Sequence, residues 1–376
     1  MGLGEVQRLL LDVGASRRNG QYIEAALDGT GVSVTDLLAA ELVREEGELY
    51  TLAFPLLTTE NQRVLLEISE RYARGLADAY LRQRGEFDEL LSRYPVAGIA
   101  KTSLAYLLVG CFSLDWDGIQ LTQELGYRTP FGTQGVPTVY WAIETENREV
   151  AYPKAVYWGS HNEYLDNGIA FTSFGDFASI PRHGLPDLAW YMARSLRSVD
   201  VPHELAPIVE RVGWGALQGA LEQAGAIMMA LRSGEKSADE ISDATGINSG
   251  DTRQLLTLLE ALGYVRRVTD DYAIAIPVFA EEDRSMVLDL IDLSREIMTS
   301  WLAENYDPCK AELARTTPLG NVLPFENTFW NVWHYLFGAA NRILVEQGMF
   351  ADPYGVDRRY KGFIPAVWHR SVNRRG

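Results

Sequence analysis

Two aspartates separated by one residue, Asp115 and Asp117, are the first candidates for chemistry. They flank Trp116, and a pair of carboxylates can serve as general acid and base or hold a cation. The same spacing is also common in solvated turns and helix caps, where Asp side chains accept hydrogen bonds from the backbone. A lone pair of this kind favours the turn or cap, so we predict no catalytic role for it.

The histidines and cysteines follow no catalytic or metal-binding pattern. Ser160 and His161 are adjacent, but neighbouring residues of a strand point to opposite faces and cannot form a nucleophile–base pair. No phosphate-binding or dinucleotide-binding glycine motif is present, and the two cysteines, Cys111 and Cys309, lack a CxxC partner. We therefore expect no enzyme active site, no metal and no cofactor. The five histidines are scattered at His161, His183, His203, His334 and His369.

Basic side chains are a minority in this chain of 376 residues, whose formal net charge is −17. Such a charge argues against broad, non-specific binding to nucleic acid, which depends on neutralising phosphates. Contact with DNA would need a local basic surface. Arg253, Arg266 and Arg267 are the candidates for one.

Helices and a turn are expected to lead up to these arginines. Apolar residues recur at helical spacing up to Leu231, and Arg232-Ser233-Gly234 ends that helix. Ser237 lies three residues before Glu240, the spacing of a capping box, which predicts a short second helix. Gly246 then supplies a tight turn.

A third helix and a hairpin complete the segment. The helix, capped by Ser249 or Asp251, carries a leucine face and ends at Gly263. Residues 264–268 and 272–276 alternate as strands do, with residues 269–271 as the turn between them.

The order of these elements over residues 224–277 resembles the DNA-reading domain of bacterial winged helix-turn-helix transcription regulators, of the arsenic-repressor and multiple-antibiotic-resistance-repressor kind. The resemblance covers about a seventh of the chain. It implies that the third helix enters the major groove of double-stranded DNA and that the hairpin contacts the backbone or minor groove. The residues so implied are Ser249, Asp251, Thr252, Arg253, Gln254, Thr257, Arg266 and Arg267.

An internal repeat extends the pattern. Shifted by 222 residues, the segment 42–68 aligns without a gap with 264–290 and is identical at seven positions. With six further residues inserted, 136–141 matches 364–369. We predict an α+β fold of tandem, duplicated winged-helix halves (1–145 and 222–376) joined by a β-rich spacer (146–221) and related by a pseudo-two-fold axis. The identical pairs are Val43/Val265, Arg44/Arg266, Tyr50/Tyr272, Ala53/Ala275, Pro55/Pro277, Glu60/Glu282 and Leu66/Leu288.

The first copy is expected to be a degenerate reader. Its segment before the hairpin has no counterpart of Arg253, and its hairpin reads Arg44-Glu45-Glu46-Gly47-Glu48. A surface of this kind repels phosphate, so we expect a scaffold or partner surface. Because Arg44 matches Arg266, Arg266 could be structural in both copies, and Arg267 is the better candidate for phosphate.

A long amphipathic helix should follow each hairpin. Its apolar stripe includes Leu65, Ile68, Tyr72 and Leu76 in the first half and Met286, Leu290, Leu293, Ile297 and Trp301 in the second. Such stripes usually belong to the core, and here the two could pack on each other, so that a monomer mimics a dimer. A pseudo-two-fold monomer and a homodimer both stay open.

The spacer is expected to hold strands within 136–180, a loop over 163–168 and a helix over 186–197. Its aromatic residues have two interpretations. The favoured one is core packing; the other is a pocket between the halves for a small aromatic effector. That pocket would be lined by Tyr140, Trp141, Tyr157, Trp158, His161, Trp330 and Trp333.

The C-terminal stretch from Val356 is basic in an otherwise acidic chain. It contains GFIPAVW, which we expect to be a strand of the folded domain. Its arginines and lysine could contact a phosphate backbone or close onto the acidic body, which we favour. They are Arg358, Arg359, Lys361, Arg370, Arg374 and Arg375.

The leading hypothesis is a cytoplasmic, DNA-binding transcription regulator. No apolar run reaches the roughly 18 residues of a membrane span, and the N-terminus does not read as a signal peptide. Two alternatives stay open: a winged-helix protein that has lost DNA binding and acts through protein or ligand contacts, and a DNA-repair glycosylase-like enzyme. Residues 224–277 hold five basic and eight acidic side chains, a net of −3, which favours the first alternative.

Overall fold

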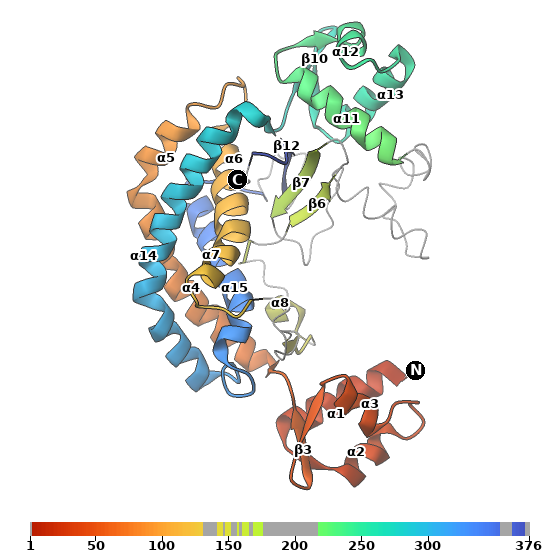
Figure 1. Ribbon diagram of the computed structural model, residues 1–376, viewed down its shortest axis with the longest axis vertical. Helices are drawn as coiled ribbons and strands as arrows, with labels where there is room; N and C mark the ends of the chain where they lie inside the picture. Colours follow the sequence, from red (N-terminus) through yellow and green to blue (C-terminus); the bar gives the residue numbers. More distant parts are fainter. Residues whose placement is uncertain are drawn as a thin grey trace. The chain divides into compact units, whose positions relative to one another are not determined.

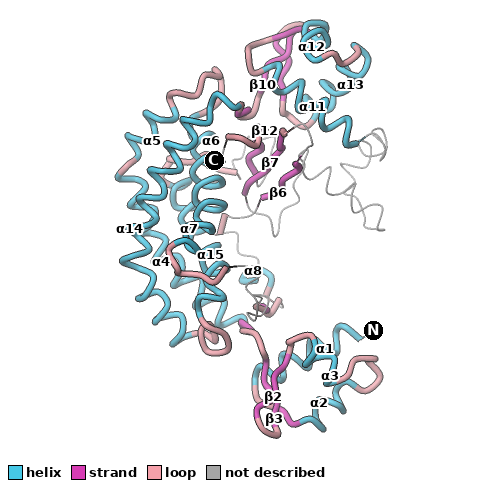
Figure 2. The backbone as a smooth tube through the Cα atoms, in the orientation of Figure 1, coloured by secondary structure: helices cyan, strands magenta, loops and turns pink. Residues whose placement is uncertain are grey.

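Helices and small sheets alternate along the chain, which makes it a mixed α+β protein (Figures 1 and 2). The computed structural model describes residues 2–130, 141–145, 147–151, 156–157, 160–164, 168–175, 217–353 and 363–372. In these ranges no helix is both long enough and apolar enough to cross a bilayer.

The chain divides into two compact units, each built from three segments. Unit 1 comprises residues 1–75, 119–153 and 299–336, and unit 2 comprises 76–118, 154–298 and 337–376. Three of the divisions fall inside the long helices 59–82, 284–316 and 325–346, so neither unit coincides with one of the predicted halves. The predicted halves were defined by the repeat in the sequence, which this division into units does not test. They therefore stay a prediction.

The N-terminal part of unit 1 is a small helical module with a three-stranded sheet. The N-terminal caps are polar side chains: Asn19 accepts a hydrogen bond from the Tyr22 amide, and Ser33 forms a capping box with Asp36. Ile23, Leu37 and Val43 are buried in its core. The elements are α1 (Gly2–Ala15), β1 (Arg18–Asn19), α2 (Gly20–Leu27), α3 (Val34–Ala39), β2 (Val43–Glu46) and β3 (Leu49–Leu52), with strand order β1-β3-β2.

Residues 217–274 of unit 2 follow the same order of elements (green to teal in Figure 1). The predicted capping box of Ser237 and Glu240 is confirmed, and Gly246 ends its helix at φ 70°. The cap of the third helix is a correction: Asn248, not Ser249 or Asp251, accepts from the Asp251 amide at 2.9 Å. The elements are α11 (Leu217–Leu231), β8 (Lys236–Ser237), α12 (Ala238–Thr245), α13 (Ser249–Ala261), β9 (Val265–Val268) and β10 (Asp271–Ile274), with strand order β8-β10-β9.

The turn between β9 and β10 holds Thr269 at φ 56°, in the left-handed region. The turn between β2 and β3 has Gly47 there, at φ 70°. A β-branched side chain is strained in this conformation, whereas glycine is not. Thr269→Gly is therefore expected to raise the free energy of unfolding by about 1 kcal/mol, measured by urea denaturation. The reciprocal change, Gly47→Thr, should lower it; a Thr269→Gly protein no more stable than the parent would contradict the strain.

Two long helices pack against each other in antiparallel directions: α4 (Thr59–Arg82) and α14 (Arg284–Thr316). Within unit 1, Arg71 of α4 forms an ion pair with Glu312 of α14. Within unit 2, the Tyr80 hydroxyl hydrogen-bonds to Ser294. Of the predicted apolar stripes, Leu65, Leu76, Leu290 and Trp301 are buried.

Short parallel strand pairs occur in both units. In unit 1, β4 (Leu56–Leu57) pairs with β5 (Ala142–Ile143); in unit 2, β11 (Val278–Phe279) pairs with β12 (Phe363–His369). Leu56 lies opposite Ala142 and Val278 opposite Val367. The partners Ala142 and Val367 are 225 positions apart, whereas Leu56 and Val278 are 222 positions apart. The alignment of 136–141 with 364–369 uses a spacing of 228 positions, and it stays a prediction because residues 136–140 lie outside the described residues.

Unit 2 also contains a four-stranded sheet of order β11-β12-β7-β6 (Figure 1). The predicted C-terminal strand is confirmed as β12. Glu163 and Tyr164 end β6 (Ser160–Tyr164) instead of lying in a loop, and β7 is Ile169–Gly175. The helix expected over 186–197 lies outside the described residues. The other elements are α5 (Arg84–Leu91), α6 (Lys101–Ala105), the π-helix η1 (Tyr106–Asp117), α7 (Gly118–Glu124), α8 (Arg148–Ala151), the 3-10 turn η2 (Glu281–Asp283) and α15 (Phe325–Glu346).

Candidate nucleic-acid interface

One face of α13 is exposed and the other is buried. Arg253, Gln254 and Thr257 lie on the exposed face. Thr252 is 0% exposed, among the buried leucines, with its hydroxyl directed at the Ile247 carbonyl. It cannot reach DNA, so its place among the predicted contacts was wrong: position 252 falls on the core side of the helix.

The first turn of α13 is occupied by its own cap. The Asp251 carboxylate accepts a hydrogen bond from the side-chain amide of Asn248 at 2.5 Å. A carboxylate at this end of a helix is also stabilised by the helix dipole. Ser249 is exposed, and its hydroxyl lies 3.4 Å from that of Ser242. Asp251 therefore has a structural role and would repel a phosphate placed near it.

Each arginine predicted to bind DNA pairs with a carboxylate. Arg253 lies 2.7 Å from Asp239 of α12, with side-chain exposures of 60% and 73%. Arg267 lies 3.5 Å from Glu260 of α13, and this hydrogen bond raises the pKa of Arg267 above its ordinary value. Exposed pairs of this kind contribute little to stability, so a phosphate could replace either carboxylate at small cost.

The two hairpin arginines point in different directions, as successive residues of a strand must. Arg267 reaches Glu260 on α13 and donates to the Tyr272 hydroxyl at 2.7 Å. Arg266 points instead toward Glu235, 3.8 Å away and just before β8. Of the two, Arg267 is the one that lies beside α13.

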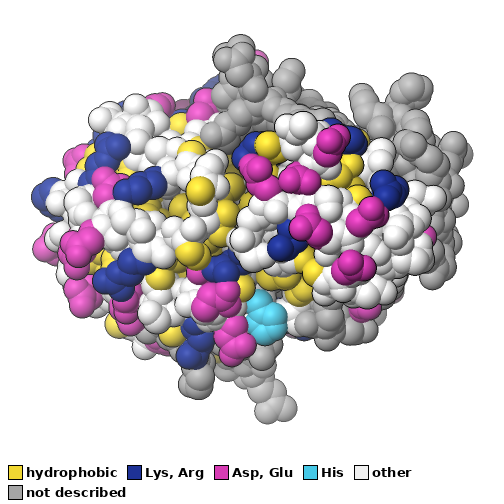
Figure 3. All heavy atoms as spheres, turned by 90° about the horizontal axis from the view of Figure 1, so that it is seen from above, with side chains coloured by type: hydrophobic (Ala, Val, Ile, Leu, Met, Phe, Trp, Pro, Cys, Tyr) yellow, Lys and Arg dark blue, Asp and Glu magenta, His cyan; other side chains and the backbone are white. Residues whose placement is uncertain are grey.

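Basic and acidic side chains are interspersed on the surface. On the face drawn in Figure 3, dark-blue and magenta groups alternate, without a continuous basic area among the described residues. Asp239 and Glu260 are the partners that sequence reasoning missed. A count of charges gave the net of −3, but it could not tell which carboxylates adjoin the arginines.

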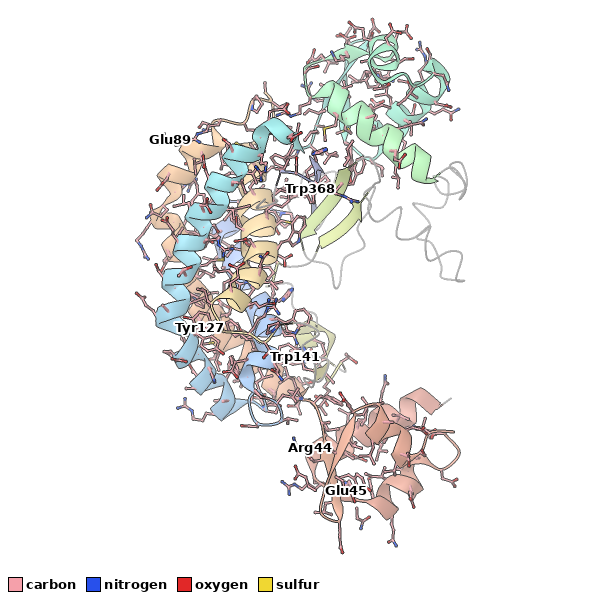
Figure 4. The ribbon with its side chains drawn as sticks, viewed as in Figure 1. Arg44, Glu45, Glu89, Tyr127, Trp141 and Trp368 are labelled. Atoms are coloured by element: carbon pink, nitrogen blue, oxygen red, sulfur yellow. The ribbon has the colours of Figure 1, made fainter. Side chains whose placement is uncertain are left out.

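The corresponding surface of the first module is smaller and more acidic. Its α3 has 6 residues, against 13 in α13. Arg44, which projects from β2 next to Glu45 (Figure 4), pairs with Glu46 at 3.0 Å and donates to the Val322 carbonyl at 3.2 Å. These contacts tie Arg44 to its own unit.

Several of the aromatic residues proposed for an effector pocket pack against neighbours of their own unit. Trp333 is 0% exposed and packs against Trp301 and Phe329, at ring distances of 6.2 and 6.4 Å. It belongs to the core, so its assignment to a pocket was wrong.

Trp141, Trp330 and Tyr157 each contact a neighbour within their own unit. Trp141 of unit 1 contacts Tyr335 at 5.9 Å (Figure 4), and Trp330 contacts the His334 ring at 5.2 Å. The Tyr157 amide of unit 2 donates to the Gly338 carbonyl. His161 lies in β6, and Tyr140 and Trp158 lie outside the described residues.

The aspartate pair is not in a solvated turn or a cap, contrary to expectation. Both residues lie in η1, where Asp115 is 5% exposed and burial raises its pKa from 3.8 to about 7. Asp117 forms an ion pair with Arg295 at 2.8 Å. No cluster of three or more metal-ligating side chains occurs in the ranges that the structure describes.

Comparisons with known proteins give no relative. No protein-family model, curated protein or solved structure matches the chain.

Proposed function

We propose that the chain is a DNA-binding transcription regulator, in which residues 224–277 form a winged helix-turn-helix and α13 enters the major groove. The observation that carries the proposal is the module built from α11, α12, α13 and the β9–β10 hairpin. It leaves one face of α13 open to solvent, with Arg253 and Gln254 on it and Arg267 of the hairpin beside it. Exposed donors on a helix next to a hairpin are the arrangement with which winged helices read DNA.

The same proposal includes a duplication. Both modules have the order helix, strand, helix, helix, hairpin, and in both the third strand lies between the first and the second. Each is followed by a short strand in a parallel pair and by a long helix. This agreement supports a tandem origin in which the second copy reads DNA and the first, with Arg44 engaged and an acidic hairpin, acts as scaffold.

The test is Arg253→Ala on a DNA site selected from a random pool by the intact protein. Losing a bidentate contact to a base should weaken binding to that site roughly tenfold to a hundredfold, and should relax the preference at one base pair. Fluorescence anisotropy at fixed salt measures both effects. Arg63→Ala is the matched control, because Arg63 is an exposed arginine of α4 paired with Glu60 at 3.2 Å.

A companion variant should act in the opposite direction. Asp239→Asn removes the carboxylate that holds Arg253 and should strengthen binding. Unchanged affinity and preference in Arg253→Ala would remove α13 from the DNA surface.

The competing function is a winged helix that no longer binds DNA. The carboxylate beside each of Arg253, Arg266 and Arg267 favours it. If the intact protein enriches no sequence from the random pool at low salt, this alternative replaces the proposal.

A further inference from the structure

Unit 2 contains a hollow of about 440 Å³ that the proposed DNA contacts do not use. It lies where three structural elements meet: the turn before β7, the segment from η2 into α14, and the end of β12. Its volume is in the range of pockets that hold small molecules. The lining residues are Gly168, Glu281, Arg284, His369, Arg370 and Ser371.

Backbone contacts fix the walls of the hollow. The Arg370 amide donates to the Gly168 carbonyl at 2.8 Å, and the Arg284 Nε donates to the Ser371 carbonyl at 3.1 Å. The His369 Nδ1 lies 2.7 Å from the Ser371 hydroxyl. Arg284, His369 and Arg370 are half-buried, so their side chains are partly ordered before a ligand binds. Such preorganisation lowers the entropic cost of binding.

Gly168 allows the backbone to pass close to the imidazole ring of His369. Its φ is +84°, and a Cβ at this position would lie 3.1 Å from the His369 Nε2. A larger residue would be strained in this backbone conformation and would crowd the ring. The turn is thus suited to keeping His369 at the edge of the hollow.

The charges of the lining favour an anion. The residues that line the hollow include two arginines, Arg284 and Arg370, and a single acidic residue, the exposed Glu281. Arg284 is also the first residue of α14, a helix of 33 residues, so the positive end of the helix dipole lies at the same place. Guanidinium groups bind carboxylate and phosphate oxygens through paired N–H donors.

We propose that this hollow is a binding site for a small oxyanion, the phosphate or carboxylate group of a small molecule. Arg284 and Arg370 bind the oxygens, and the Ser371 hydroxyl and His369 lie beside them as further hydrogen-bonding groups. The site does not depend on DNA binding, because none of its residues belongs to α13 or to the β9–β10 hairpin.

Isothermal titration calorimetry of the full chain without DNA tests the site, with inorganic phosphate and malonate as separate probes at constant ionic strength. We expect saturable binding of at least one probe. Arg370→Gln should weaken it roughly tenfold, because a charge-assisted hydrogen bond is lost. Glu281→Gln should tighten binding, because a carboxylate that repels the anion is removed. Because Glu281 is exposed, this variant should keep the fold, and it tests the site even if Arg370→Gln is unstable.

Arg63→Gln, an exposed arginine on α4, is the control and should bind as the parent does. Binding of phosphate alone would identify a phosphorylated ligand, and binding of malonate alone a carboxylic acid. Binding of neither probe would overturn the proposal. Equal weakening in Arg370→Gln and Arg63→Gln would also overturn it, since that result indicates general surface charge.

Discussion

Arg232→Met is expected to lower the free energy of unfolding by about 3–5 kcal/mol, the largest effect of any single substitution considered for this chain. Arg232 follows α11 and lies 2.6 Å from Asp283 of η2, with side-chain exposures of 11% and 4%. Its Nε donates to the Val278 carbonyl at 3.2 Å. Burial already raises the pKa of Asp283 above its ordinary value, so removing the guanidinium leaves a carboxyl group that pays a full desolvation cost or takes up a proton.

Urea denaturation measures this loss, and the chain offers a close control. Arg253 and Asp239 are 2.7 Å apart, almost the same separation, but both are mostly exposed. Arg253→Met should therefore cost less than about 1 kcal/mol. The double variant Arg232→Met/Asp283→Leu should recover much of the loss, because no unpaired charge is left in the interior. Similar losses in Arg232→Met and Arg253→Met would show that burial does not decide the contribution of this pair.

The sequence predicted Arg232 only as part of a helix end and did not predict its buried ion pair. The features it predicted correctly depend on neighbouring residues: the capping box of Ser237 and Glu240, the turn at Gly246, and the hairpin near residues 265–274. The buried partner of Arg232 is Asp283, 51 positions along the chain. No local pattern identifies a partner at that distance.

For the candidate interface, too, the sequence predicted the local helix but not the contacts between elements. Helical periodicity identified α13, but the core face includes Thr252 as well as the leucines, and a polar residue gave no sign of its burial. Arg253 and Gln254 are exposed as expected. The carboxylate of Asp239 comes from another helix, so only the packing of α12 on α13 brings it to Arg253.

The π-helix η1 gave no signal in the sequence. Residues 106–117 are almost continuously apolar, without the one-sided spacing of a surface helix. Asp115 therefore resembled part of a turn, although it lies among buried side chains. Its burial has a consequence for stability that can be measured.

Asp115→Asn is expected to make the protein more stable above neutral pH and to leave its stability unchanged near pH 4. In the unfolded chain Asp115 ionises near 3.8, and in the folded protein near 7, because burial disfavours the charged carboxylate. Over this interval the folded state keeps a proton that the unfolded state releases, so the free energy of unfolding falls as pH rises from about 4 to about 7. The interval corresponds to about 4 kcal/mol at 1.36 kcal/mol per pH unit, an upper limit for the difference at pH 8.

Urea denaturation from pH 4.5 to 8 measures the difference in the free energy of unfolding between Asp115→Asn and the parent. The contributions of titratable groups common to both proteins cancel in this difference. Asp239→Asn is the control for the loss of one carboxylate at the surface, because the Asp239 side chain is 73% exposed. Asp117 and Arg295 form an ion pair close by that is present in both proteins, so its contribution cancels in the difference. A difference for Asp115→Asn that stays constant from pH 4.5 to 8 would mean that Asp115 is ionised throughout, and that the π-helix solvates a buried carboxylate instead of holding it neutral.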